Sequence, residues 1–289
     1  MKHLYRVLLV LPVLLAVSNL AAAEDAKKAA PLRVLIVAGG CCHDYASQSK
    51  ILKAGIEERI NAKVTVVLNL SKSTGARFEI YKNPGWANAF DVILHDECSA
   101  SVTDKDYVKR ILDAHKDGKP AVNLHCAMHS YRWGDFRQAV KLGAENAGWF
   151  EMIGLQSTGH GPQAPIDVAY EDDHPVTKGL KDWTTINEEL YNNVHVFKGT
   201  TVLGNGTQTQ KPRARELKEN PNAKPRVSKA VVVWANEFGP NKTKIFSTSL
   251  GHNNDTVADD RYLDLVVRGL LWTTGNLTED GKPADGYGK

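Results

Sequence analysis

The run from Leu32 to Ala38 constrains the fold more than any other part of the sequence. It reads LRVLIVA and ends in Gly39-Gly40. Apolar residues follow one another here without polar alternation, so the run predicts a strand that is buried on both faces. Such strands occur mainly in parallel sheets that helices cover on two sides.

Helical and strand patterns alternate after this first strand. Residues 47–60 have apolar side chains at helical spacing, and Thr103 and Asp104 are typical of the start of a second helix over residues 103–112. Buried strands are predicted at residues 63–70, 90–95 and 120–125. The alternation predicts βαβ units, and therefore an α/β fold with a mostly parallel, doubly wound sheet of flavodoxin-like or Rossmann-like outline, flanked by helices.

The second half of the chain is richer in strands and extends the same mixed sheet. Its predicted elements are strands at 166–170, 194–203, 230–235 and 244–249 and a helix at 260–272. No linker rich in Pro, Gly or Ser separates the halves, so we expect a single domain over residues 32–275. Residues 206–228 read as a surface insertion, and residues 276–289 as a loose C-terminal tail.

The N-terminus has the pattern of a secretory signal peptide. Basic residues precede the apolar run from Val7 to Val17, and small residues end at Ala23, which gives a cleavage site. We therefore expect a signal peptide over residues 1–23, a disordered leader over 24–31, and a secreted or periplasmic protein. A retained N-terminal anchor is the rival interpretation.

Charge and hydropathy limit the partners of the mature chain. The 36 Lys and Arg residues nearly balance the 33 Asp and Glu residues. No long basic block stands out, so nucleic acid is not an expected partner. No later segment approaches the roughly 18 consecutive apolar residues of a membrane span, so no membrane contact is expected after signal cleavage.

Four cysteines follow the signal peptide, at positions 41, 42, 98 and 126. None has the C-x-x-C spacing of a metal or redox motif. An oxidising compartment would allow one bridge among them, and free buried thiols are the equal alternative.

Several of the ten histidines stand at or just after predicted strand ends. They are His43, His95, His125, His129 and His252. Ligands of open α/β sheets bind beyond the carboxyl ends of the strands, so imidazoles converging there would form a site for proton transfer, polar recognition or metal binding. Each alone could equally be a structural histidine.

The first of these loops, residues 39–45, matches no nucleotide-binding fingerprint. Gly39 and Gly40 would let the backbone approach a bound group, while His43 and Asp44 would contact it. The alternative is a tight turn in which Asp44 caps the following helix.

The loop after the strand at 120–125 contains Cys126 and His129. Cys126 stands where a nucleophile elbow would lie, but bulky neighbours replace the usual flanking glycines. A buried packing thiol is the alternative to a nucleophile.

Polar side chains of the second half complete the set. A flexible turn carries His160, and the segment Glu188 to Tyr191 places carboxylates beside a phenol, a combination that serves as acid, base or sugar contact. His252 and Asn253 end the last strand with groups that suit carbohydrate hydroxyls.

Together these segments resemble the ThuA-like (trehalose utilisation) family. The resemblance covers roughly residues 33–275. Its sharpest elements are GGCCHD at 39–44, Leu124-His125, Gly159-His160, DHPV at 173–176, EELY at 188–191 and TSLGH at 248–252. It implies a fold similar to class I glutamine amidotransferases and a part in the breakdown of trehalose or related disaccharides through 3-keto sugars. Members commonly have a small residue other than Cys at the elbow, so the resemblance does not support amidotransferase chemistry at Cys126.

We therefore expect an exported enzyme that acts on a glycoside or keto-glycoside, with carbohydrate as its small-molecule partner. His125 or His129 would be the base, and Glu189 with Tyr191 the acid or sugar anchor. Further contacts would come from Gly39, Gly40, His43, Asp44, His160, His252 and Asn253. No cofactor is required by the sequence, and a divalent metal held by His43, His125 and His252 is a variant.

Two other classes of function compete with this one. A non-catalytic carbohydrate-binding protein would stack sugar rings on Trp86, Trp133, Trp149 or Trp183, although packing roles suit these residues too. A Cys126-dependent hydrolase is the third hypothesis.

Overall fold

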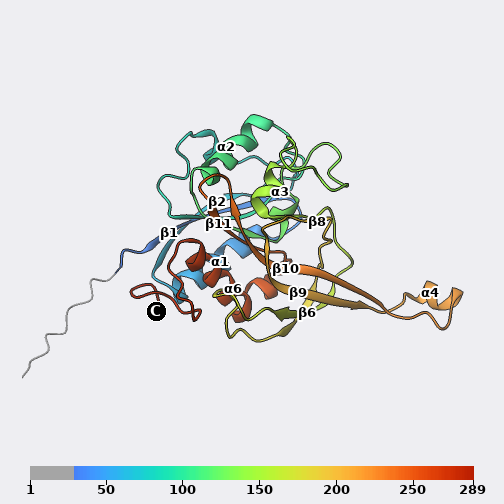
Figure 1. The fold of residues 1–289 in the computed structure, drawn as a ribbon. Coiled ribbons are helices and arrows are strands. Elements are labelled where there is room, and N and C mark those ends of the chain that lie inside the picture. The colour runs from blue at the N-terminus through green and yellow to red at the C-terminus, as the bar shows by residue number, and fades with distance from the viewer. Residues whose placement is uncertain (1–28) are drawn as a thin grey trace, which may run out of the picture.

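The computed structural model describes residues 29–289, so the predicted signal peptide and most of the predicted leader lie outside the described residues. The described chain folds around a nine-stranded sheet in the order β2-β1-β3-β4-β11-β10-β9-β6-β7 (Figure 1). These strands are β1 (Leu32–Gly40), β2 (Ala62–Asn69), β3 (Val92–Cys98), β4 (Ala121–Leu124), β6 (Ala164–Tyr170), β7 (Trp183–Glu188), β9 (Thr201–Gln210), β10 (Arg226–Phe238) and β11 (Thr243–Thr248). A two-stranded sheet pairs β5 (Leu155–Gln156) with β8 (His195–Val196).

The sheet has a parallel and an antiparallel half. Strands β2, β1, β3, β4 and β11 pair in parallel, whereas β11, β10, β9, β6 and β7 pair antiparallel. The α/β sheet predicted from the alternating pattern is thus confirmed as one mixed sheet. In the second half, strands that follow one another in the chain pair antiparallel (β6 with β7, β9 with β10 and β10 with β11), and such pairs need no crossover helix.

Helices cover both faces of the parallel half. They are α1 (Tyr45–Arg59), α2 (Lys105–Lys116), α3 (Gly148–Ile153), α5 (Asn254–Val257) and α6 (Asp260–Thr273), with 3-10 turns η1 (Glu79–Lys82) and η2 (His125–His129). Alternate residues of β1 point to opposite faces: Ile36 packs with Leu52 of α1, and Val37 packs on the side of Ile111 of α2. Burial on both faces explains the continuous apolar run. No helix among residues 29–289 is long and apolar enough to span a bilayer.

The antiparallel half carries a long arm. Strands β9 and β10 continue beyond the sheet and end in the short helix α4 (Ala214–Glu219) (Figure 1). The insertion predicted at residues 206–228 is therefore partly strand, and the strand predicted at 194–203 is divided into β8 and β9.

The C-terminal tail is not loose in the structure. The backbone N–H of Asn61 donates to the carbonyl oxygen of Tyr287 over 2.8 Å, and Ile60 pairs with Gly288 in a β-bridge. The side-chain amide of Asn61 also donates to the carbonyl oxygen of Gly286 over 3.1 Å. Backbone hydrogen bonds, which no apolar pattern announces, hold the tail beside the start of β2.

His95 does not reach the edge where a ligand would bind. It lies within β3, fully buried, and its Nε2 is 2.9 Å from Nε2 of His115 on α2. The Nδ1 of His115 donates to the carbonyl oxygen of Lys119 over 2.6 Å. The Nδ1 of His95 is 2.9 Å from the carboxylate of Glu97. His95 therefore belongs to a buried polar network of the core.

This network predicts a loss of stability in acid. Burial, reinforced by His95, lowers the pKa of His115 to about 3. The unfolded chain binds this proton near the ordinary pKa of about 6.5. The contribution of neutral His115 to the free energy of unfolding is therefore complete above that pH and is lost as the pH falls towards 3. The slope for this one group reaches about 1.4 kcal/mol per pH unit.

Urea unfolding between pH 7 and pH 4 checks this expectation. His115→Gln should lower the stability at pH 7 and make its pH dependence flatter by the slope of one group. His195→Gln, at a partly exposed histidine, is the control and should keep the original slope. Equal slopes for all three proteins would contradict the assignment to His115.

Candidate functional site

Three histidines meet at the carboxyl-terminal edge of the parallel strands. His43 follows β1, His125 follows β4 and His252 follows β11. The ring centroid of His43 lies 4.7 Å from that of His125 and 4.7 Å from that of His252. The structure thus brings together imidazoles that are far apart in the sequence, as expected for loops on one edge of a parallel sheet.

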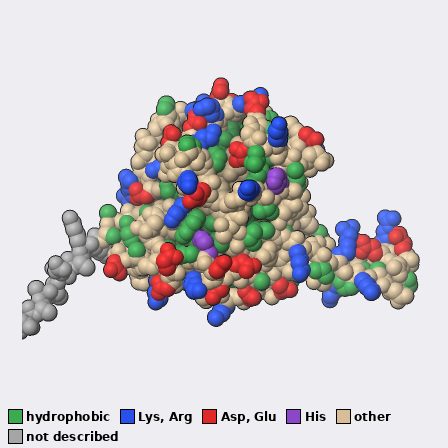
Figure 2. All heavy atoms as spheres, viewed as in Figure 1, with side chains coloured by type: hydrophobic (Ala, Val, Ile, Leu, Met, Phe, Trp, Pro, Cys, Tyr) green, Lys and Arg blue, Asp and Glu red, His purple; other side chains and the backbone are tan. Residues whose placement is uncertain are grey.

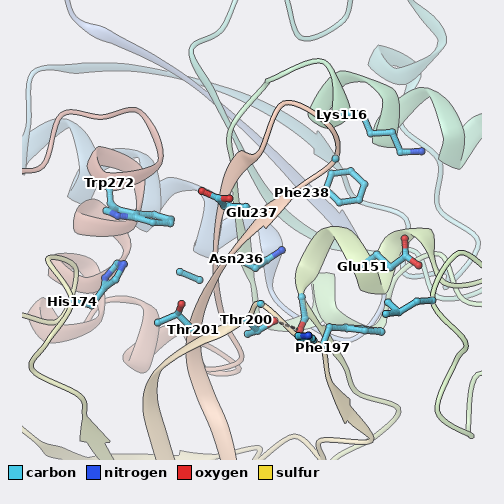
Figure 3. Close-up of a pocket in the computed structure, with 16 residues that line it drawn as sticks. Lys116, Glu151, His174, Phe197, Thr200, Thr201, Asn236, Glu237, Phe238 and Trp272 are labelled. Atoms are coloured by element: carbon cyan, nitrogen blue, oxygen red, sulfur yellow. Dashed lines mark hydrogen bonds between the residues drawn. The ribbon is translucent and has the colours of Figure 1, made fainter.

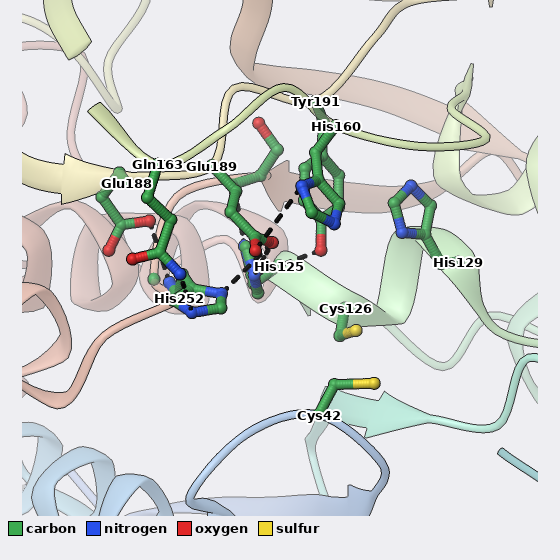
Figure 4. Close-up of polar contacts among 12 residues, drawn as sticks. Cys42, His125, Cys126, His129, His160, Gln163, Glu188, Glu189, Tyr191 and His252 are labelled. Carbon is green, nitrogen blue, oxygen red and sulfur yellow. Dashed lines mark hydrogen bonds and ion pairs between the residues drawn. The ribbon is translucent and has the colours of Figure 1, made fainter. Parts of the chain in front are cut away.

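Glu189, in the loop after β7, lies among these rings (Figure 4). Its Oε2 is 3.2 Å from Nδ1 of His252 and 3.7 Å from Nε2 of His125. Its Oε1 is 3.5 Å from Nδ1 of His160. The hydroxyl of Tyr191 lies 3.1 Å from Nε2 of His125. One carboxylate is therefore surrounded by nitrogen atoms from three separate segments.

Contact between Glu189 and His252 shifts the pKa of each side chain. Burial alone would raise the pKa of Glu189, but hydrogen bonds with His125 and His252 outweigh burial and hold this pKa well below its ordinary value. The hydrogen bond with Glu189 in turn raises the pKa of His252, against the effect of partial burial. Glu189 is consequently ionised at neutral pH.

The backbone at the end of β4 aims His125 into the site. His125 has a φ of 37°, in the left-handed region that residues other than glycine rarely adopt. Its Nδ1 donates to the carbonyl oxygen of Ser249, 2.7 Å away at the end of β11. With Nδ1 bound to this carbonyl oxygen, Nε2 is the ring nitrogen that faces Glu189 and Tyr191.

Glu188 has a role that the sequence did not reveal. This buried carboxylate accepts the backbone N–H groups of His252 and Asn253 over 3.0 and 3.1 Å. It thereby fixes the loop after β11 against the end of β7. The alternating direction of side chains along a strand was the available signal, because it separates Glu188 from Glu189.

Gly39 and Gly40 are required by the close packing of β1 against its neighbouring strands. Their φ values are 139° and 95°, and a Cβ atom would lie 2.1 Å from the carbonyl oxygen of Asn69 or 2.2 Å from that of Cys98, respectively. Only glycine allows β1 to pass so close to its neighbours. Contact between their amides and a ligand stays a prediction.

Asp44 caps helix α1, which was the alternative interpretation of the first loop. Its Oδ1 accepts the backbone N–H of Ser47 over 3.2 Å, and its Oδ2 accepts from the Asn254 amide over 2.9 Å. Asp44 also borders the outer opening of the site.

His129, His160 and Asn253 surround the centre. His129 stacks on Tyr191 at 4.2 Å between ring centroids, and its Nε2 lies 2.9 Å from the Ser157 hydroxyl. Burial lowers the pKa of His129. His160 also stacks on Tyr191, at 5.8 Å between ring centroids, and is exposed. The Asn253 amide donates to the carbonyl oxygen of Asn187. His129 thus supports Tyr191, whereas His160 reaches Glu189.

These side chains border two adjoining hollows. The inner hollow, of about 350 Å³, is lined by His43, His129, His160, Glu189 and Tyr191. The outer hollow, of about 720 Å³, is lined by polar groups that include Asp44, Gln163 and Asn253. Both share His43 and His252, so a bound molecule could contact the centre and the outer polar side chains together.

Comparison with known families decides the relationship. The model of the family ThuA, described as trehalose utilisation, matches residues 33–273.

The chain belongs to the ThuA family.

Two solved ThuA-like structures share this fold. A putative ThuA-like protein from Parabacteroides merdae is 18% identical, with a TM-score of 0.59 over 86% of this chain and 92% of that chain. One from Bacteroides uniformis is 17% identical, with a TM-score of 0.55 over 87% and 94% of the two chains. At such identities the likeness concerns the fold alone. A search of the curated proteins found no match.

The four cysteines of this ThuA protein lie beside the site. Cys41 and Cys42 form a disulfide, while Cys98 and Cys126 are free and buried. The sulfur atoms of Cys98 and Cys126 are 2.9 Å apart, and this hydrogen bond, together with burial, raises the pKa of Cys126. His125, not Cys126, occupies the strained elbow. Neither feature favours a nucleophilic thiolate.

Alkylation tests the role of these thiols. Treatment of the native protein with iodoacetamide should leave Cys98 and Cys126 unmodified, because both side chains are buried. Mass spectrometry of the unfolded, unreduced chain should then find these two thiols, and reduction should add Cys41 and Cys42. Rapid labelling of Cys126 with loss of turnover would restore the hydrolase hypothesis.

A third hollow of the ThuA domain, of about 600 Å³, lies away from His43, His125 and His252 (Figure 3). His174 and Trp272 border one side, and Phe197 and Phe238 border the other. It lies near the turn between β10 and β11 and the end of α2, opposite the edge where open α/β sheets bind ligands. The hollow with the converging titratable groups is therefore the stronger candidate.

Proposed function

We propose that this ThuA-family protein binds a glycoside in the histidine-lined hollow and transfers protons to and from it, as an exported enzyme of disaccharide breakdown. The arrangement of Glu189 among His125, His160 and His252 carries the proposal. The family description names trehalose utilisation, and the N-terminal sequence supports export.

The reaction that suits this site is elimination from a 3-keto-glycoside. A carbonyl group at C3 acidifies the hydrogen at C2, so a base can remove it as a proton. The electron pair of the broken C–H bond forms a double bond between C1 and C2. The glycosidic oxygen leaves C1 with its bonding electrons and takes a proton from an acid. Atoms and charge balance without an oxidant or reductant.

Glu189 is the base of this proposal. It is 10% exposed in its side chain, ionised, and borders the inner hollow, where a sugar carbon could approach it. His160, which is more exposed, is placed to protonate the leaving oxygen. Tyr191 anchors a sugar hydroxyl near His125. The outer polar side chains, among them Asp44 and Asn253, would bind the second ring.

The non-catalytic alternative loses its main support. Of the four tryptophans that could have stacked on sugar rings, Trp86, Trp149 and Trp183 are buried. Trp133 packs against the core on the side of α2. None of the four lines either hollow beside the histidines.

A substrate panel tests the proposal. Mature protein would be incubated with trehalose, related disaccharides and their 3-keto derivatives, with and without divalent ions, and released sugars would be measured by chromatography. Release from keto-glycosides but not from their parents is expected. Binding of these sugars without release would identify a binding protein instead, and absence of both would refute the sugar assignment.

A further inference from the structure

We infer that His43, His125 and His252 hold a divalent transition-metal ion such as zinc. Each residue offers one nitrogen, and these three atoms lie within 4.8 Å of one another. Two nitrogens that bind one zinc ion stand roughly 3 to 4 Å apart, since each Zn–N bond is about 2.0–2.1 Å long. Small side-chain movements would therefore close the three imidazoles around an ion.

Neighbouring groups orient the rings as they do at metal centres. The Nδ1–H of His125 is bound to the carbonyl oxygen of Ser249, which leaves Nε2 as the ligand atom. The outer nitrogen of His252, Nε2, lies 2.7 Å from the side-chain amide of Gln163, so Nδ1 faces inward. Metal-binding histidines are held by such bonds through the nitrogen that does not bind the metal.

His43 supplies a further observation. Its Nδ1 is buried and has no hydrogen-bond partner among the described residues. A buried polar nitrogen without a partner is unfavourable, and a metal–nitrogen bond would satisfy it. Glu189 lies beside His125 and His252 and would balance the charge of the ion.

The ligand atoms select the kind of ion. Three imidazoles suit zinc and related first-row metals, whereas magnesium and calcium prefer oxygen ligands. Cys41, Cys42 and Cys98 also cluster within 4.8 Å, but the disulfide removes two of their thiols. The histidine cluster is thus the stronger metal site.

The role of the ion in turnover rests on the proposed function, whereas its binding does not. An ion at this position would polarise the carbonyl oxygen of a keto sugar beside Glu189 and so acidify the neighbouring C–H bond.

Metal binding can be measured without any substrate. Full mature protein would be stripped with a chelator, dialysed, and titrated with Zn²⁺ by calorimetry and with Co²⁺ by visible absorption. We expect one equivalent to bind and a cobalt spectrum typical of imidazole ligands. His43→Gln and His252→Gln should each weaken binding by at least about 100-fold, because even indirect supports of metal ligands contribute about 10–100-fold.

A matched control and a positioning variant sharpen the test. His174→Gln removes a histidine from the third hollow, away from the proposed ligands, and this variant should bind both ions as the unaltered protein does. Glu188→Gln should weaken binding by about 10–100-fold, because Glu188 fixes the backbone of His252. Circular dichroism would establish that each variant is folded.

The outcomes separate this inference from the proposed function. Equal Zn²⁺ affinity in the unaltered protein and in folded His43→Gln and His252→Gln would overturn the metal site. Turnover by chelator-stripped protein that binds no ion would overturn it too, and would leave the proposed function in place. A bound ion without turnover of any sugar would retain the site and remove the function.

Discussion

Replacing Glu189 with glutamine is expected to lower kcat on a keto-glycoside by about 10²–10⁴-fold, the usual contribution of a positioned general base. Glutamine keeps the size and hydrogen-bonding capacity of the side chain but cannot accept the proton. Because Glu189 would balance the charge of the ion without being one of the three proposed ligands, Zn²⁺ affinity should fall by no more than about 100-fold, the upper contribution of an indirect support. Product release by chromatography and calorimetric titration of the same sample would measure the two effects.

Glu171→Gln, at an exposed carboxylate directly after β6, is the matched control and should leave kcat unchanged. If Glu189→Gln retains kcat within tenfold, Glu189 is not the base. A loss of Zn²⁺ affinity well beyond about 100-fold would instead make Glu189 a metal ligand.

Gly40→Ala should destabilise the protein by about 3 kcal/mol or more, because unfavourable backbone conformation and overpacking add. The new Cβ would lie 2.2 Å from the carbonyl oxygen of Cys98 at a φ of 95°. Backbone atoms of two paired strands cannot move apart without breaking their hydrogen bonds. Urea unfolding at pH 7 measures the loss.

Gly118→Ala separates the two causes. Gly118 has a φ of 106°, but nothing lies within 4 Å of the position of its Cβ. Only the backbone conformation should matter there, at about 1–2 kcal/mol. Equal losses in the two variants would mean that β1 and β3 are not packed as closely as described.

Local patterns predict the parallel half of the fold well. The strand at residues 32–38 and the helix after it stand out because burial on both faces and amphipathic spacing leave strong sequence signals. Strand β7 was missed because its burial does not follow its polarity: Thr185 and Glu188 are buried, whereas Ile186 is exposed. The C-terminal tail and the arm are held by backbone hydrogen bonds and strand pairing, which side-chain patterns do not predict.

The site was predictable in its location and less so in its roles. His43, His125 and His252 could be grouped because each follows a strand of one parallel sheet. The roles of neighbouring residues depend on contacts that the sequence does not specify. Gly40 allows close packing of two strands, and Asp44 caps a helix. The elbow fell on His125 instead of Cys126 because the strand ends one residue earlier than a nucleophile elbow would require.

The three imidazoles also have a consequence for how the chain holds together. His43 lies near the beginning of the domain and His252 near its end, so any ligand that binds both links segments separated by most of the polypeptide. Such a ligand binds only the assembled sheet, and it therefore adds RT ln(1 + [L]/Kd) to the free energy of unfolding of the whole domain. In this protein, the fraction of molecules with a ligand on these histidines and the stability of the domain therefore rise together.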